Sequence, residues 1–114
     1  MKNIAVVIPA RLNSTRLKHK MLMMFDDEPL IRIVFDKVRM MGFDTFVATD
    51  SKRIAKHLPI KWCIKTGKAN NGTHRLSKRV VLDLVGHYDY IINIQGDMID
   101  INHETMKPIL KALN

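Results

Sequence analysis

Residues 3–11 read NIAVVIPAR, and this stretch decides the fold class. The apolar, β-branched run over residues 3–8 is halted by Pro9, as expected for a strand that is buried on both faces of a parallel sheet. A basic stretch follows directly, from Arg11 to Lys20. The sequence therefore predicts a buried first strand that leads into a cationic loop.

Further strands and helices are expected to alternate along the rest of the chain. Apolar residues recur at helical spacing over 29–41 and over 73–85, and Gly42 and Gly86 are suited to end these two helices. The remaining expected elements are strands at 45–48, 61–64 and 90–95, a short helix capped by Asp50 or Ser51 that runs to about His57, and a final helix at 102–113 with Asn102 as its cap and Pro108 inside it. Such alternation implies right-handed crossovers. The predicted fold is therefore α/β, with a Rossmann-like, mostly parallel sheet and helices on both faces.

Length, charge and cysteine content limit the functional classes. The 114 residues, 46% of them hydrophobic, suffice for one compact core and are too few for two ordinary domains. The lone Cys63 and the lack of a long apolar run lead us to expect a cytoplasmic protein without a membrane partner. The formal net charge of +8 favours an anionic partner. Aromatic residues are few, so nucleic acid is not the expected partner, although a basic nucleic-acid-binding module stays open as an alternative.

Polar residues that directly follow the expected strands are the candidates for a site, because parallel sheets bind ligands beyond the carboxyl ends of their strands. The loop at residues 9–20 offers backbone N–H groups, small hydroxyls and several cations, which is the composition of a polyphosphate cradle. A solvated basic loop is the simpler alternative for an arbitrary protein. Zinc is not expected, since no histidine pairs with a cysteine or carboxylate at ligand spacing.

Four blocks of the sequence resemble, in the same order and at nearly the same spacing, the signature of the 3-deoxy-manno-octulosonate cytidylyltransferases, or CMP-KDO synthetases. The blocks are IPAR at 8–11 with STRL at 14–17 and Lys20, VATD at 47–50, NGT at 71–73 with RL at 75–76, and NIQGD at 93–97. Together they extend over most of the chain. The resemblance implies a fold of the nucleotide-diphospho-sugar transferase type and a single nucleotide-binding domain over residues 1–114.

The resemblance also implies an activity and a set of site residues. The family transfers CMP from CTP to a 3-deoxy-sugar acid, releases pyrophosphate and uses Mg²⁺. Arg11, Arg16 and Lys20 would bind the phosphates, and Asp97 would bind the metal; these four are the candidate catalytic residues. Gln95 can both donate and accept a hydrogen bond, which suits the reading of cytosine. Contacts with CTP are also implied for Ala10, Ser14, Asn71, Gly72 and Thr73.

Some positions keep a structural alternative or depart from the family pattern. Residues 71–73 are also suited to cap a helix, and Asp50 is expected to cap rather than to serve the site. The family usually has Pro-Gly where this chain has Lys18 and His19. It has an acidic residue at His74, and only Lys68 can stand in for one family arginine. The sequence leaves the roles of Asp50, Lys68 and His74 open.

The family is considerably longer than this chain. Its C-terminal half, which this chain lacks, carries a second metal-binding aspartate, most of the sugar-acid pocket and the dimer interface. We therefore expect the isolated chain to bind CTP and magnesium weakly and to release little or no pyrophosphate. The partner left open is a second copy of the chain, in a homodimer, or a complementing C-terminal fragment that would complete the site. A CTP-binding remnant or half-subunit without turnover is the alternative. The sequence does not determine which sugar acid is used.

Overall fold

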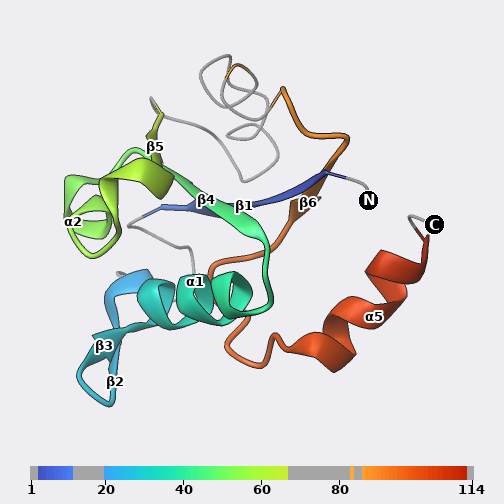
Figure 1. Ribbon diagram of the computed structural model, residues 1–114. Helices are drawn as coiled ribbons and strands as arrows, with labels where there is room; N and C mark the ends of the chain where they lie inside the picture. Colours follow the sequence, from blue (N-terminus) through green and yellow to red (C-terminus); the bar gives the residue numbers. More distant parts are fainter. Residues whose placement is uncertain (1–2, 12–19, 67–82, 84–85, 113–114) are drawn as a thin grey trace.

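The computed structural model describes residues 3–11, 20–66, 83 and 86–112. Its centre is a four-stranded sheet made of β1 (Ile4–Ala10), β4 (Asp44–Thr49), β5 (Cys63–Lys65) and β6 (Tyr90–Asn93). The strands lie in the order β5-β4-β1-β6, and every neighbouring pair is parallel. This arrangement, visible in Figure 1, confirms the predicted parallel α/β sheet.

The central strand β1 continues past its predicted stop at Pro9 and ends at Ala10. The carbonyl of Val7 accepts the N–H of Ile94. Along β1 the backbone N–H and C=O groups of every second residue point to the same neighbour, so the backbone of Pro9, like that of Val7, faces β6. The pairing with β6 already ends at Val7 and Asn93. The missing N–H of Pro9 therefore leaves no ladder hydrogen bond unmade, which is why the strand tolerates it.

Helix α1 (Leu30–Met40) packs against one face of the sheet. Its fully buried Ile31, Val34 and Val38 join β1 side chains in the main hydrophobic core. The helix ends at Met40, and Gly42 follows as the predicted stop. The φ of Gly42, +95°, lies in the left-handed region that glycine adopts without a steric penalty.

The short helix α2 (Lys52–Ala55) begins at a side-chain cap. The hydroxyl of Ser51 accepts the backbone N–H of Ile54, at 3.2 Å. Of the two predicted caps, Asp50 and Ser51, the structure has Ser51, which is the residue in the extended conformation that precedes the first helical turn. The expectation that Asp50 caps this helix was therefore wrong.

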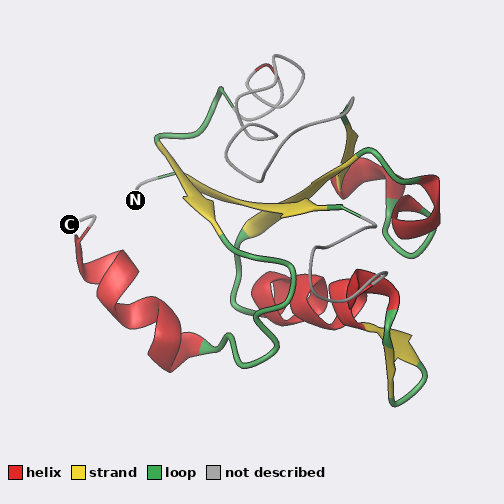
Figure 2. Ribbon diagram, turned by 180° about the vertical axis from the view of Figure 1, so that it is seen from behind, coloured by secondary structure: helices red, strands yellow, loops and turns green. Residues whose placement is uncertain are grey.

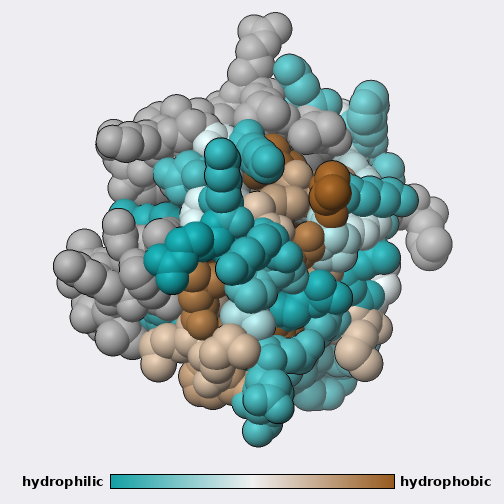
Figure 3. Space-filling view, turned by 90° about the vertical axis from the view of Figure 1, so that its left-hand side faces the viewer, coloured by the Kyte–Doolittle hydropathy of each residue, from teal (hydrophilic) through white to brown (hydrophobic). Residues whose placement is uncertain are grey.

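Between β1 and α1 the chain forms a hairpin that the sequence analysis did not predict. A 3-10 turn, η1 (Lys20–Leu22), leads into β2 (Met24–Phe25), which pairs antiparallel with β3 (Glu28–Pro29). Positive φ angles at Asp26 and Asp27 give the tight turn that suits a two-residue hairpin loop. Met23 and Met24 are 41% and 59% exposed. The hairpin carries them to the surface, and apolar patches are visible low on the face in Figure 3.

Helix α5 (His103–Ala112) closes the described chain and contains Pro108. Its cap is Asn102, as predicted: the Asn102 side chain accepts the N–H of Thr105, at 3.0 Å. Met106 anchors the helix in the same core that α1 covers, and Figure 2 shows both helices on one side of the sheet. No helix within the described ranges is long and apolar enough to cross a membrane.

The opposite face of the sheet has a second, smaller core. Ala5, Val7, Phe46, Ala48 and Ile64 are buried there, and Trp62 and Tyr88 pack against them. The other 3-10 turn, η2 (Ile60–Trp62), precedes β5 and supplies this tryptophan. The helix predicted at 73–85 lies outside the described residues, apart from the helical Asp83.

Candidate functional site

The strand order locates the candidate site. Strands β4 and β5 lie on one side of β1, and the later strand β6 lies on its other side. In open α/β sheets ligands bind outside the carboxyl ends of the strands, at the point where the strand order reverses. Here that point lies between the carboxyl ends of β1 and β6, at Ala10 and Asn93.

The residues that follow β1 supply the first wall of this edge. Ala10 is 2% exposed and pairs with Thr49 of β4, so only a small side chain stands at the end of the strand. Arg11 follows and is exposed. The predicted phosphate ligands Ser14 and Arg16 lie outside the described residues.

The residue that follows next in the described chain, Lys20, contacts the loop that follows β6. Its ammonium donates a hydrogen bond to Oδ2 of Asp97, with 2.7 Å between the two atoms. The side chains are 39% and 36% exposed, and exposed ion pairs contribute at most about 1 kcal/mol to stability. The importance of this pair is therefore its position, since it joins a predicted phosphate ligand to the predicted metal ligand across 77 positions of sequence.

Close packing supports the two ends of this pair. A Cβ atom added to Gly96 would lie 2.8 Å from Sδ of Met21 and 3.2 Å from Cδ1 of Ile31. A larger residue at position 96 would displace Met21, so the neighbours of Lys20 and Asp97 pack directly against each other. Nothing in the local sequence pattern connects positions 21 and 96.

The turn after β6 is held by its own backbone. The N–H of Met98 donates to the carbonyl of Gln95 at 3.2 Å, and the N–H of Ile99 donates to that of Asp97 at 2.9 Å. The turn leaves Gln95 exposed beside the carboxyl edge. Asp50 is also exposed and follows the carboxyl end of β4 at the same edge.

The other predicted positions, Lys68, Asn71, Gly72, Thr73 and His74, lie outside the described residues. Among the residues that are described, no group of three or more histidine, cysteine or acidic side chains could hold a metal ion alone. A metal at Asp97 would therefore need ligands in addition to the described side chains.

The groups with shifted pKa values lie near the opposite, amino edge of the sheet. Tyr88 donates a hydrogen bond to Asp44, the first residue of β4, and this bond raises the pKa of Tyr88 to about 12. Burial raises the pKa of Cys63, and the charge of Lys65 partly offsets that effect. Neither Tyr88 nor Cys63 is therefore placed to act at the carboxyl edge.

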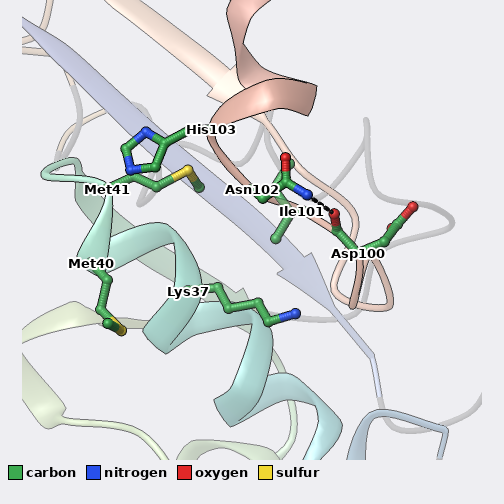
Figure 4. Close-up of a pocket in the computed structure, with 7 residues that line it drawn as sticks. All are labelled: Lys37, Met40, Met41, Asp100, Ile101, Asn102 and His103. Carbon is green, nitrogen blue, oxygen red and sulfur yellow. Dashed lines mark hydrogen bonds between the residues drawn. The ribbon is translucent and has the colours of Figure 1, made fainter.

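A hollow of about 400 Å³ lies between the end of α1 and the start of α5 (Figure 4). It is lined by Lys37, Met40, Met41, Asp100, Ile101, Asn102 and His103. The Asn102 amide donates to the carbonyl of Asp100 at its rim, at 3.1 Å. None of the predicted site residues lines this hollow. Its lining resembles no catalytic arrangement, so we place the candidate site at the carboxyl edge instead.

Comparisons with known proteins show the family of this chain. The family model described as cytidylyltransferase matches residues 5–114. The 3-deoxy-manno-octulosonate cytidylyltransferase of Francisella tularensis is 39% identical over 101 residues, which cover 85% of this chain and 40% of that protein. The chain thus spans less than half the length of this relative.

Solved structures show the same fold. The structure of CMP:2-keto-3-deoxy-manno-octonic acid synthetase complexed with CTP matches with a TM-score of 0.79 and 26% identity, covering 97% of this chain and 47% of that chain. A Mycobacterium tuberculosis protein in complex with manganese matches with a TM-score of 0.69 and 19% identity, covering 96% of this chain and 59% of that chain. The second likeness concerns the fold alone.

Proposed function

The chain belongs to the cytidylyltransferase family, and on this premise we propose that it forms the nucleotide-binding part of an enzyme that transfers CMP from CTP to a 3-deoxy-sugar acid. The observation that carries the proposal is the meeting of Lys20 and Asp97 at the reversal point of the strand order. The names of the Francisella relative and of the CTP-bound synthetase support the choice of nucleotide and of acceptor.

The described residues have separate roles in this proposal. The small side chain of Ala10 lets the nucleotide approach the backbone, and Arg11 and Lys20 neutralise its phosphates. Gln95, exposed beside the edge, reads the cytosine by donating and accepting hydrogen bonds. The sequence motifs add Ser14, Arg16, Asn71, Gly72 and Thr73 to the proposed nucleotide contacts.

Asp97 is the proposed ligand of a divalent cation, with Mg²⁺ as the expected ion. Magnesium is typically held by one or two carboxylates together with substrate phosphates and water, so a single accessible carboxylate beside phosphate-binding cations fits it. When bound, Mg²⁺ supplies charge that offsets the developing charge on the phosphates. The manganese complex of the mycobacterial protein is in keeping with a divalent ion in this fold.

In the proposed reaction a hydroxyl of the sugar acid attacks the α-phosphate of CTP, the bond to the β-phosphate breaks, and pyrophosphate leaves. In this proposal Arg11, Arg16 and Lys20 stabilise the negative charge that grows on the leaving pyrophosphate, because each carries a positive charge that can contact it. We propose that the enzyme acts in the cytoplasm. We also propose that the chain associates with a second copy of itself, or with a complementing fragment that supplies the remainder of the sugar-acid site.

Calorimetric titration with CTP and magnesium tests the nucleotide proposal directly. We expect one saturable site that prefers CTP to ATP and UTP. A single-stranded oligonucleotide serves as the control for a basic nucleic-acid-binding module. Binding without base preference, with an affinity that falls steeply and linearly in log salt, would reject the nucleotide site in favour of that module.

A further inference from the structure

The Lys20–Asp97 contact has a consequence for the order in which ligands bind. The ammonium of Lys20 lies 2.7 Å from Oδ2 of Asp97, which is the distance of a strong charge-assisted hydrogen bond. While this contact exists, one of the three N–H donors of Lys20 is directed at Asp97, and a positive charge lies beside the carboxylate oxygen that a metal would bind. The two groups that the proposed function needs are therefore each other's partner.

We propose that the Lys20–Asp97 pair couples metal binding to nucleotide binding, so that the divalent ion binds well only together with the triphosphate. This inference rests on the proposed function of the same edge. A metal that arrives alone must share Asp97 with an ammonium of like charge, which weakens its binding. A triphosphate supplies the anion that Lys20 can contact instead, and Asp97 then becomes available to the metal.

The packing around the pair makes such an exchange of partners a local event. Met21 packs against Gly96, so the backbones on both sides are held at a set separation. The N–H of Met23 donates to the carbonyl of Lys20 at 3.1 Å and closes the turn that carries the lysine. Lys20 itself is 39% exposed, so its side chain can rotate from Asp97 to a phosphate without a backbone movement.

A binding measurement without nucleotide tests the coupling. The probe is Mn²⁺, whose free ion is counted by electron paramagnetic resonance. We expect Lys20→Met to bind Mn²⁺ about fivefold more tightly than the unmodified chain, the upper range for an exposed charge pair. We also expect CTP to strengthen Mn²⁺ binding less in this variant. Equal or weaker Mn²⁺ binding by Lys20→Met would overturn the proposal.

Two further variants show whether charge is the cause. Lys37→Met removes the same charge from a lysine that donates to the carbonyl of Ile99, near the same turn, and should leave Mn²⁺ binding unchanged. Lys20→Gln removes the charge but keeps a hydrogen-bond donor, and should strengthen Mn²⁺ binding as Lys20→Met does. A gain in Lys37→Met, or a gain confined to Lys20→Met, would contradict the electrostatic coupling.

The outcome separates this inference from the proposed function. Tighter Mn²⁺ binding by Lys20→Met together with no selectivity for CTP would support the effect of Lys20 on the metal at Asp97 and would reject the proposed CTP site. Selective CTP binding together with unchanged Mn²⁺ affinity would keep the function and reject the coupling. Because the pair is exposed, thermal unfolding of both Lys20 variants should match that of the unmodified chain.

Discussion

The carboxyl and amino edges of the sheet differ in how their side chains are partnered. At the carboxyl edge an exposed lysine and aspartate meet, with Arg11, Gln95 and Asp50 exposed beside them. Toward the amino edge, Trp62 and Tyr88 pack edge to face on Phe46, with ring centroids 5.2 and 6.0 Å away. The comparison indicates that packed rings hold the strands together at one end, whereas exposed polar and charged side chains gather at the other end.

Arg39 makes a cation–π contact with the cluster formed by the Phe46, Trp62 and Tyr88 rings. The guanidinium of Arg39 lies 4.3 Å from the Trp62 ring centroid and donates to the carbonyl of Phe43. On the other side of the sheet, the backbone N–H of Asn3, before β1, donates to the carboxylate of Asp89, before β6, at 3.1 Å. These contacts join segments that precede β1, β4, β5 and β6, so each strand begins from a fixed position. Because the strands begin in fixed positions, their carboxyl ends also lie in fixed positions relative to one another.

Removal of the Phe46 ring, which contacts both Trp62 and Tyr88, should have the largest effect on stability. We expect Phe46→Ala to lower the free energy of unfolding by about 3–4 kcal/mol, because the ring is 9% exposed and both edge-to-face contacts depend on it. Chemical denaturation measures this change. Ile60→Ala is the control, since Ile60 is 93% exposed and its loss should stay within about 0.5 kcal/mol. Similar losses in the two variants would show that the cluster does not anchor the strands.

A side chain at Gly96 should disturb the carboxyl edge more than the fold. Gly96→Val would push Met21 and Ile31 aside, at a cost of about 1–3 kcal/mol, and would separate Lys20 from Asp97. We expect weaker binding of CTP and magnesium as well. The double variant Met21→Ala with Gly96→Val should lose less stability than the sum of the two single variants, because the smaller side chain makes room. Strict additivity would mean that the two residues do not pack together.

The cationic loop can be tested by comparing two of its members. We expect Arg16→Ala to weaken CTP binding roughly tenfold, the value of a charge-assisted hydrogen bond, and Lys18→Ala to weaken it less. Only Arg16 occupies a position that matches the family signature. Titration calorimetry at one fixed salt concentration compares the two. Equal, small losses would count against a built phosphate site and would favour a solvated basic loop.

The smallest expected effect is the pH response of the amino edge. The hydrogen bond to Asp44 raises the pKa of Tyr88 to about 12, from an ordinary value of 10.0. The resulting stability is complete below pH 10.0 and is lost as the pH rises toward about 12, because the unfolded chain loses the proton first. In a Tyr90→Phe background, ultraviolet titration of the folded chain should find this high midpoint, and Asp44→Ala should lower it. An ordinary midpoint in the folded chain would argue against the bond.

Local patterns in the sequence predicted the helices and strands well where contacts between residues close in sequence stabilise them. The helical stripe of α1, its stop at Gly42 and the cap at Asn102 follow from contacts within a few residues. The alternation of these elements predicted the parallel sheet. The family signature in the four blocks agrees with the match of the cytidylyltransferase model to residues 5–114.

Other features depend on contacts that no local pattern contains. Strand β1 extends past Pro9 only because β6 has ended beside it, and Met24 is exposed only because a hairpin carries it outward. The capping residue changed from Asp50 to Ser51 through the placement of the first turn of α2. The roles of Ser14, Arg16, Asn71, Gly72 and Thr73 stay predictions from the motifs, since these positions lie outside the described residues.

The sequence by itself determined which residues have the chemical capacity to bind a phosphate, a metal or a base, because hydrogen-bonding capacity, charge and chain flexibility belong to each residue and its neighbours. Tertiary structure alone decided that Lys20 contacts Asp97, with Met21 packed beneath Gly96. That contact requires β6 to lie beside β1, and the strand order β5-β4-β1-β6 is selected by burial of both faces of the sheet. The free energy of burying the two faces comes from residues far apart in the chain, so no single stretch of sequence determines the strand order.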